Sequence, residues 1–369
     1  MKKRNLREIL RGFGFKQWFL LILNLVLVLA CAACAIGLRT VSTTLETTTA
    51  ARRFQGAGET RFAQLACYLP VGQGKTEEDI LTFRQGLDAK FTEQSLEAPE
   101  NGSLYVDAYS GSAAVTVSTD YGSAELTALG VGGDFFYFHP LPLRSGSYIA
   151  ERDLMDDLVV LDEVMAWRLF GGIDLTGMTV YINAEPFVVS GVVALEDDFA
   201  TSRARTQEGA VFLSYSALNR LMEGLTIDCY EIVLPDPITG YAYGVMEESF
   251  QIGEGDLVEN SSRYTLSHLL DVIGSVGERS MRTNGVIYPY WENALRLTED
   301  YAALLLILAV LFALCPLTFA VVFAIRSLRR GYRRLKIAVP EKVGSAVERR
   351  REQKYEQELG NQVSKTEGE

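Results

Sequence analysis

Two long apolar runs lie near the two ends of the chain. The first, Trp18 to Leu38, has 21 residues and one strongly polar side chain, Asn24. The second, Tyr301 to Ile325, has 25 residues and no charge. A helix of 21 residues is roughly 31 Å long, which is enough to cross the hydrocarbon layer of a membrane. The pattern therefore predicts transmembrane helices over 18–38 and 301–325.

The first run has two further interpretations. A cleavable signal peptide has a shorter apolar region than this one. A lipoprotein signal would end at Cys31, since Val28-Leu29-Ala30-Cys31 is close to a lipobox, and the mature chain would then be anchored by lipid. However, apolar residues continue from Ala32 to Leu38, whereas an anchored lipoprotein usually becomes polar directly after its cysteine. The sequence therefore favours an uncleaved transmembrane helix.

Between the two runs, short strand-like and helix-like patterns alternate. The clearest unit begins with the apolar strand 158–161, continues with a helix that Asp162 caps, and stops at Gly171-Gly172. Residues 178–182 and 187–193 then form a hairpin. Strands are also expected over 61–69, 104–109, 113–118, 124–129, 211–214 and 230–234, and helices over 76–91, 215–223 and 238–250. Thr76 and Asp79 predict a capping box at the start of the first of these helices. Residues 264–284 carry apolar residues at helical spacing, broken by Gly274 and Gly277. The alternation predicts an α+β domain over residues 39–300, in one lobe or in two.

The charges of the chain are distributed unevenly. The 369 residues have a formal net charge of −12. Residues 1–38 hold six Lys and Arg against one Glu, residues 326–369 hold twelve against seven Glu, and residues 39–300 hold seventeen against thirty-nine acidic residues. The basic flanks of membrane spans stay in the cytoplasm, so we expect both termini inside the cell membrane and residues 39–300 outside. The acidic middle argues against nucleic acid as a partner.

The segments beside the two spans suggest contacts with lipid and with a partner. Residues 1–17 form a basic segment with apolar residues at helical spacing, which predicts an amphipathic helix on membrane lipid, with an unstructured basic flank as the alternative. Tyr288, Tyr290 and Trp291 precede the second span, as an interfacial aromatic belt would. A charged tail, 326–369, follows that span and is expected to be cytoplasmic. Its first basic residues are candidates for docking a partner: Arg326, Arg329, Arg330, Arg333, Arg334 and Lys336.

Residues that carry catalysis or bind metals are not grouped in this sequence. His139 and His268 are far apart and have no metal-ligand spacing, and no P-loop, nucleophile elbow or H-E-x-x-H helix occurs. We therefore expect no catalytic, cofactor or metal site. Of five cysteines, Cys67 and Cys229 fall outside the spans, in predicted strands. They are candidates for a disulfide in an oxidising compartment, and the sequence leaves open whether the two strands lie side by side.

The unit around residues 157–193 resembles a known family. VVLDEVMAWRLFGG, followed by DLTGMTVYINAEPFVVSGVV, is similar to the signature of the MacB-like periplasmic core domain. That domain is the extracytoplasmic part of FtsX-like (MacB-type) ABC permeases. Its pattern is a strand, a helix ending in Leu-Phe-Gly, a turn, and a hairpin ending in Val-x-Gly-Val. The similarity is close from Gly132 to Val193 and looser over 39–300.

The resemblance implies a membrane subunit of an FtsX/MacB-like ABC transporter. In that family a separate ATPase rocks the spans, and stalk helices, here 39–58 and 291–300, pass the motion to the outer domain. The implied partners are this ATPase and a permease partner or a second copy. Family permeases carry four spans, three of them after the outer domain, whereas this sequence predicts one there, so we expect a two-span, truncated member. The alternative is a non-transporting membrane sensor or regulator whose outer domain binds a ligand or protein.

Overall fold

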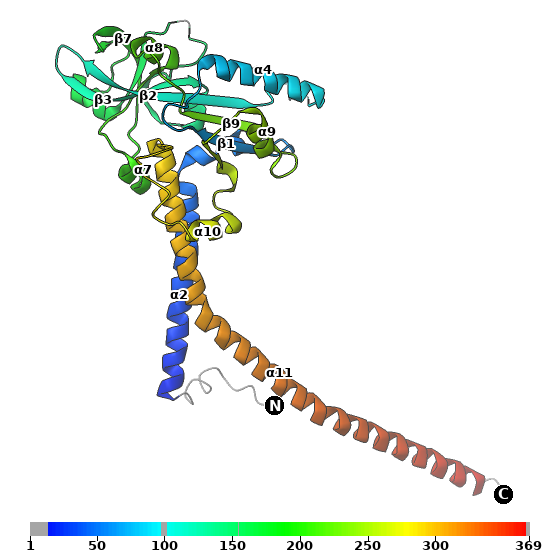
Figure 1. Cartoon of the computed structure of the whole chain (residues 1–369). Coiled ribbons are helices and arrows are strands. Elements are labelled where there is room, and N and C mark those ends of the chain that lie inside the picture. Colours follow the sequence, from blue (N-terminus) through cyan, green and yellow to red (C-terminus); the bar gives the residue numbers. More distant parts are fainter. Residues whose placement is uncertain (1–13, 97–101, 154, 367–369) are drawn as a thin grey trace. The chain divides into compact units, whose positions relative to one another are not determined.

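A computed structural model describes residues 14–96, 102–153 and 155–366 (Figure 1). Most side chains beyond Arg333 in the last helix are not described. Two compact units make up the chain: Met1–Ala35 with Ile307–Glu369, and Ile36–Leu306. Of the amphipathic helix expected over residues 1–17, residues 1–13 lie outside the described residues.

The first unit consists of parts of two long helices, α2 (Phe15–Thr44) and α11 (Tyr290–Thr366). Both are long and apolar enough to cross a membrane. Their large apolar side chains are exposed, with Leu29 at 61% and Phe323 at 64%, which is the kind of surface that lipid covers. The Cys31 thiol lies 3.6 Å from the Ala309 carbonyl oxygen, so the two helices touch inside this unit. The two long apolar helices expected on either side of the α+β domain are therefore confirmed.

The second unit is organised on one connected sheet of ten strands. The strand order is β10-β1-β9-β2-β3-β8-β5-β7-β4, with β6 beside β2 and β7. The pairs β3–β8 and β5–β7 are parallel and the others are antiparallel. The strands are β1 (Phe62–Tyr68), β2 (Val106–Ser118), β3 (Ser123–Gly133), β4 (Leu143–Gly146), β5 (Leu158–Asp162), β6 (Thr179–Ile182), β7 (Glu185–Val193), β8 (Val211–Ser214), β9 (Cys229–Pro235) and β10 (Asp256–Glu259).

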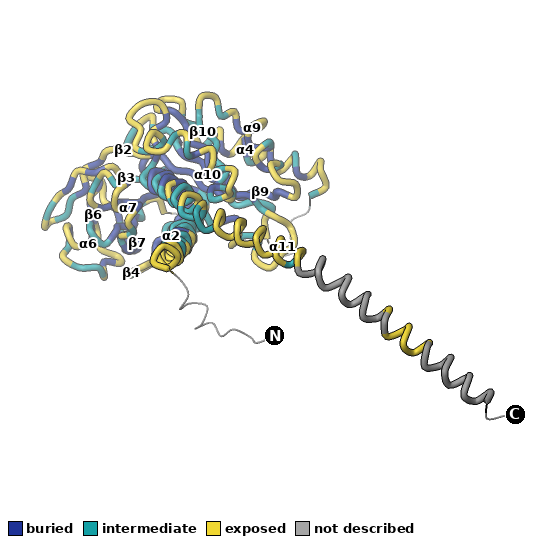
Figure 2. The backbone as a smooth tube through the Cα atoms, turned by 90° about the horizontal axis from the view of Figure 1, so that it is seen from below, coloured by how far each residue is buried: buried dark blue, intermediate teal, exposed yellow. Residues whose placement is uncertain are grey.

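Helices cover both faces of this sheet. One face packs against α4 (Glu77–Glu93), α6 (Glu163–Phe170), α8 (Tyr215–Leu221) and α9 (Tyr241–Ser249). The other face packs against α3 (Ala50–Gln55), α5 (Phe135–Phe138) and the first turns of α11, which are buried (Figure 2). The remaining short helices are η1 (Glu46–Thr48), α7 (Phe199–Ala204), η2 (Asn260–Ser262) and α10 (Leu266–Ile273).

Local sequence signals account for several helix ends. Thr76 and Asp79 form the capping box at the start of α4, and the Asp162 side chain accepts the Met165 amide at the start of α6. Gly171 ends α6 in the left-handed conformation, at φ 72°. These predicted caps are confirmed.

The prediction of two short strands over 104–109 and 113–118 is wrong. One strand of 13 residues, β2, runs through Gly111 because β3 pairs with it from Ala108–Gly133 to Ser118–Ser123. A Cβ atom on Gly111 would lie 2.3 Å from the Thr226 carbonyl oxygen. The absence of a side chain at Gly111 therefore allows the loop that contains Thr226 to pack closely against β2, and the glycine does not end the strand.

The helical pattern over 264–284 forms α10 alone, which ends directly before Gly274, where the sequence predicts a break. Another prediction near α11 is wrong. The expected aromatic belt is not at a lipid surface, since Tyr288 and Trp291 are 4% and 3% exposed. These rings pack under the sheet because α11 buries its first turns against the domain before its uncharged run begins.

Candidate functional site: a buried charge network on the first turns of α11

The first turns of α11 place three charged side chains on one face. Glu292, Arg296 and Glu299 follow one another at a spacing of four and three residues, which aligns them along the helix. They are 0%, 5% and 0% exposed. Because burying an ion is costly unless it is paired, each of these groups needs a partner of opposite charge.

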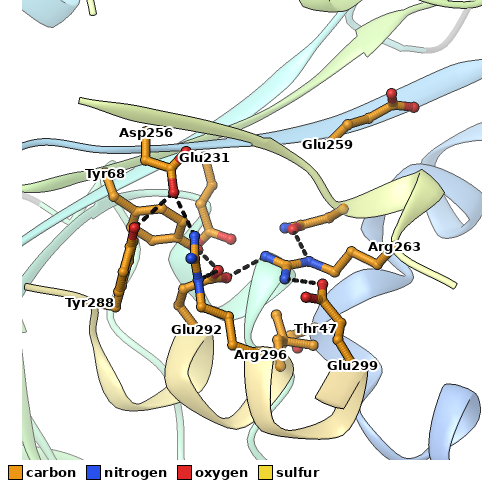
Figure 3. Close-up of polar contacts among 12 residues, drawn as sticks. Thr47, Tyr68, Glu231, Asp256, Glu259, Arg263, Tyr288, Glu292, Arg296 and Glu299 are labelled. Carbon is orange, nitrogen blue, oxygen red and sulfur yellow. Dashed lines mark hydrogen bonds and ion pairs between the residues drawn. The ribbon is translucent and has the colours of Figure 1, made fainter. Parts of the chain in front are cut away.

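Arg263, which follows η2, is the centre of the network and is itself 0% exposed (Figure 3). Its guanidinium donates to Glu299 Oε1 at 2.6 Å, to Asn260 Oδ1 at 2.7 Å and, by a short contact, to Glu292 Oε2. The Tyr68 hydroxyl of β1 donates to the same Glu292 oxygen at 3.0 Å. Burial raises the pKa of Tyr68 well above 10.0, so this hydroxyl stays protonated and continues to donate. One guanidinium thus joins two carboxylates of α11, and Tyr68 joins them to the sheet.

Arg296 forms a second connection between α11 and the sheet. Its guanidinium donates to Glu292 Oε1 and to Asp256 Oδ2, each at 2.6 Å. It also lies 3.8 Å from the centroid of the Tyr288 ring, and the Tyr288 hydroxyl donates to Asp256 at 2.8 Å. Asp256 is the first residue of the edge strand β10 (Figure 3). The same helix face is therefore held to two neighbouring strands, β1 and β10.

A third set of contacts holds the segment around α10 to α11. Arg279 pairs with Glu299, and His268 lies 3.4 Å from Glu299 Oε1. The Gly277 amide donates to Asp300 at 2.9 Å. The turn of α11 that ends in Asp300 is thus surrounded by charges from residues 263–279.

A buried His–Glu pair extends the polar contacts under the sheet. His139, after α5, and Glu231, on β9, are each 3% exposed and lie 2.5 Å apart. The His139 ring also contacts Trp291 of α11, with ring centroids 4.6 Å apart. His139 therefore has a structural position here, between the sheet and the helix.

The network makes stability dependent on pH. Burial raises the pKa of Glu299, but the positive charges of Arg263 and Arg279 and the nearby His268 ring lower it by more, so its pKa lies well below its ordinary 4.5. Glu299 precedes the uncharged run that starts at Tyr301, so it lies outside the predicted membrane-crossing segment. A carboxyl group whose pKa is lowered by folding stabilises the folded state at any pH above its pKa in the unfolded chain. This stabilisation is lost as the pH falls toward the pKa of the group in the folded chain.

We therefore expect Glu299→Gln to destabilise the chain at pH 7, and we expect the difference from wild type to shrink as the pH falls below about 4.5. Thermal unfolding of the full chain in detergent at a series of pH values measures this difference. Glu185→Gln is the matched control, since that side chain is 52% exposed. A Glu299→Gln difference that stayed constant down to acidic pH would contradict the prediction.

Cys67 and Cys229 lie on adjacent strands but point to opposite faces of the sheet. In the antiparallel pairing of β1 with β9, Cys67 is opposite Tyr230 and Cys229 is opposite Tyr68. Cys67 packs with the α4 side and Cys229 with the α11 side, and both are free thiols. This geometry gives the predicted disulfide no support, because side chains on opposite faces cannot meet.

Four of the six residues predicted to dock a partner share one side of α11. Arg326, Arg329, Arg330 and Arg333 are exposed, and their spacing of three, one and three residues places them along one face. The side chains of Arg334 and Lys336 lie outside the part of the chain that the structure describes. Within the described residues, no group of His, Cys, Asp and Glu is arranged to hold a metal ion.

The charge network itself was not predicted from the sequence. The helical spacing of Glu292, Arg296 and Glu299 did not reveal the network, because charges of alternating sign along a helix are typical of a solvent-exposed face. The partner Arg263 lies 29 residues before Glu292, so no local pattern connects the two.

Comparison with known proteins identifies the class of this chain. The model of the MacB-like periplasmic core domain matches residues 28–239, which is more than half of the chain. The chain belongs to this family, and the domain is typical of ABC transporter permeases rather than of enzymes. A search of curated proteins gave no match.

Three solved structures match parts of this chain at low sequence identity. The periplasmic region of MacB from Actinobacillus actinomycetemcomitans is 18% identical over 59% of this chain and 94% of that one, with a TM-score of 0.40. The extracellular domain of the noncanonic ABC-type transporter YknZ from Gram-positive bacteria is 14% identical over 50% of this chain and 88% of that one, with a TM-score of 0.35. A domain of a putative permease protein from Porphyromonas gingivalis is 12% identical over 64% of this chain and 97% of that one, with a TM-score of 0.30.

Proposed function

We propose that this protein is a membrane subunit of an FtsX/MacB-like ABC transporter. In this proposal both termini are cytoplasmic, residues 18–38 and 301–325 cross the membrane, and residues 39–300 lie outside. A separate ATPase moves the two helices, and the outer domain takes up this movement for export or for mechanical signalling. The observation that carries the proposal is the buried charge network, which joins the first turns of α11 to strands β1 and β10.

The network suits the transmission of movement for a physical reason. A displacement of α11 against the sheet would separate buried ions from their partners, and an unpaired buried ion costs several kcal/mol. The helix turns and the sheet are therefore expected to move as one body. Apolar contacts alone are less directional and would more easily allow the helix to slide.

The ATPase is proposed to dock on the exposed basic face formed by Arg326, Arg329, Arg330 and Arg333. This face lies on the cytoplasmic side of the second span in the proposed topology, where a soluble ATPase would meet it. Its charge favours an acidic surface on the partner.

A pull-down of the full chain tests the proposal. A tag on the C-terminal tail, extraction in mild detergent and mass spectrometry should recover an ABC-type ATPase at near-stoichiometric yield. Neutralising Arg326, Arg329, Arg330 and Arg333 to Gln should remove it. A control variant that neutralises four other basic residues of the tail, Arg349, Arg350, Arg351 and Lys354, should retain it.

Two outcomes would count against the transporter. Recovery of no ATPase, even with nucleotide and a crosslinker present, would contradict coupling to one. Recovery of a histidine kinase or an envelope hydrolase instead would favour a sensor or regulator.

A further inference from the structure

The helix α10 carries an apolar face that the protein does not cover. Leu266 and Leu270 are 62% and 56% exposed, and their spacing of four residues places them on one side of the helix. Val276, just after the helix, is 45% exposed. The opposite side of α10 is anchored in the domain, since Leu269 and Val272 are each 2% exposed. The exposed leucines are therefore not needed for holding α10 in place.

The segment that contains α10 is fixed at both ends to a single turn of α11. Before α10, the Tyr264 hydroxyl lies 2.7 Å from the Thr298 hydroxyl. After α10, the Gly277 amide donates to Asp300 at 2.9 Å. Figure 1 shows α10 beside α11. These contacts fix the level of α10 along α11 at residues 298–300.

That level coincides with a change in the sequence of α11. The charged residues end at Asp300, and the uncharged run begins at Tyr301. Leu304, one turn further, is 49% exposed. If the run crosses the membrane, as the proposed function requires, the boundary between water and hydrocarbon falls close to this turn. The apolar face of α10 then lies at the level of this boundary.

We infer that α10 lies in the interfacial region of the outer leaflet, with Leu266, Leu270 and Val276 against phospholipid acyl chains. An amphipathic helix of this kind buries its apolar face roughly 5–10 Å into the headgroup boundary. The exposed polar residues of α10, Ser267 and Asp271, lie to one side of the leucines and stay in water. Because α10 is tied to Glu299 and Asp300, the lipid surface would hold the same turn of α11 that carries the charge network. The inference rests on the membrane placement in the proposed function.

Site-directed fluorescence on the full chain tests this contact. The chain is reconstituted in vesicles of phosphatidylethanolamine and phosphatidylglycerol, with Cys31, Cys34 and Cys315 replaced by Ala. Cys67 and Cys229 are buried, and burial raises the pKa of Cys67 to about 12, so these thiols remain unlabelled. A polarity-sensitive bimane label is then placed at Leu270→Cys or, as the matched control on the same helix, at Asp271→Cys.

The expected result is opposite quenching at the two positions. A nitroxide attached near the lipid headgroup should quench the label at position 270 several-fold more than aqueous iodide does. Iodide should be the stronger quencher at position 271. Equal access of iodide to both positions would overturn the inference. Shielding of position 270 from both quenchers would also overturn it, since a second copy or a partner subunit would then cover the helix.

A third label separates this inference from the proposed function. Leu311→Cys lies in the uncharged run, where Leu311 is 56% exposed. If a nitroxide deep in the acyl chains quenches position 311 but position 270 behaves like position 271, the inference about α10 fails alone. If position 311 is open to iodide, the membrane placement fails and the proposed function fails with it.

Discussion

Arg263→Met is expected to lower the free energy of unfolding by about 3–5 kcal/mol, which is the usual cost of removing one partner from a buried ion pair. Methionine fills a similar volume, so the loss of stability comes mainly from removal of the positive charge. It leaves Glu292 and Glu299, both 0% exposed, without the guanidinium that joins them. Thermal unfolding of the full chain in detergent, followed by fluorescence of the buried Trp291 beside the network, measures the effect.

The control for this substitution is a basic residue in an exposed pair. Arg220→Met removes a guanidinium that is 50% exposed and lies 3.9 Å from Glu185. Exposed pairs of this kind contribute about 0–1 kcal/mol, so Arg220→Met should leave stability almost unchanged. Equal effects of the two substitutions would show that the buried network does not stabilise the fold.

A double-mutant cycle separates charge from packing. Glu299→Gln alone should destabilise the chain, because it leaves Arg263 and Arg279 with less negative charge around them. In the Arg263→Met background the same substitution removes a carboxylate that has lost its main partner. It should therefore lower the free energy of unfolding by less, or even raise it. Simple addition of the two single effects would contradict the assignment of Arg263 and Glu299 as a coupled pair.

The parts of the fold that the sequence predicted are those that local patterns determine. The two apolar runs, the caps at Thr76 and Asp162, and the hairpin of β6 and β7 each depend on residues within a few positions of one another. The length of β2 depended on its partner β3, and no propensity within 104–118 reveals that pairing. Strand contexts override local propensity in this way because cross-strand packing supplies most of the stabilisation.

The candidate site was hidden for the same reason. Arg263 and Glu292 are joined only when the segment after β10 folds back on α11, and the sequence contains no signal for that contact. The aromatic residues at 288–291 were ambiguous, because the composition that marks a membrane interface also marks a buried helix face. The face of each cysteine likewise depended on the register of β1 with β9, where a shift of one residue exchanges the two faces.

The glycine of the Val-x-Gly-Val signature gives the second large prediction. Gly191 on β7 is paired with Gly146 of β4 on one side and Val160 of β5 on the other. A Cβ atom at this position would lie 2.5 Å from the Ser147 carbonyl oxygen and 3.0 Å from the Ser145 carbonyl oxygen. Both are backbone atoms, so the extra methyl group can be accommodated only if β4 moves away from β7.

Gly191→Ala is therefore expected to destabilise the outer domain by about 1–3 kcal/mol or more, as overpacking usually does. Gly86→Ala is the matched control, because Gly86 lies inside α4 and, apart from the local backbone of that helix, no atom lies within 4 Å of the added methyl group. That change should instead stabilise the chain by up to about 1 kcal/mol, since alanine favours a helix. Thermal unfolding in detergent should move in opposite directions for the two variants. Equal shifts would mean that β4 yields freely, and the signature glycine would then need a reason other than the close approach of these strands.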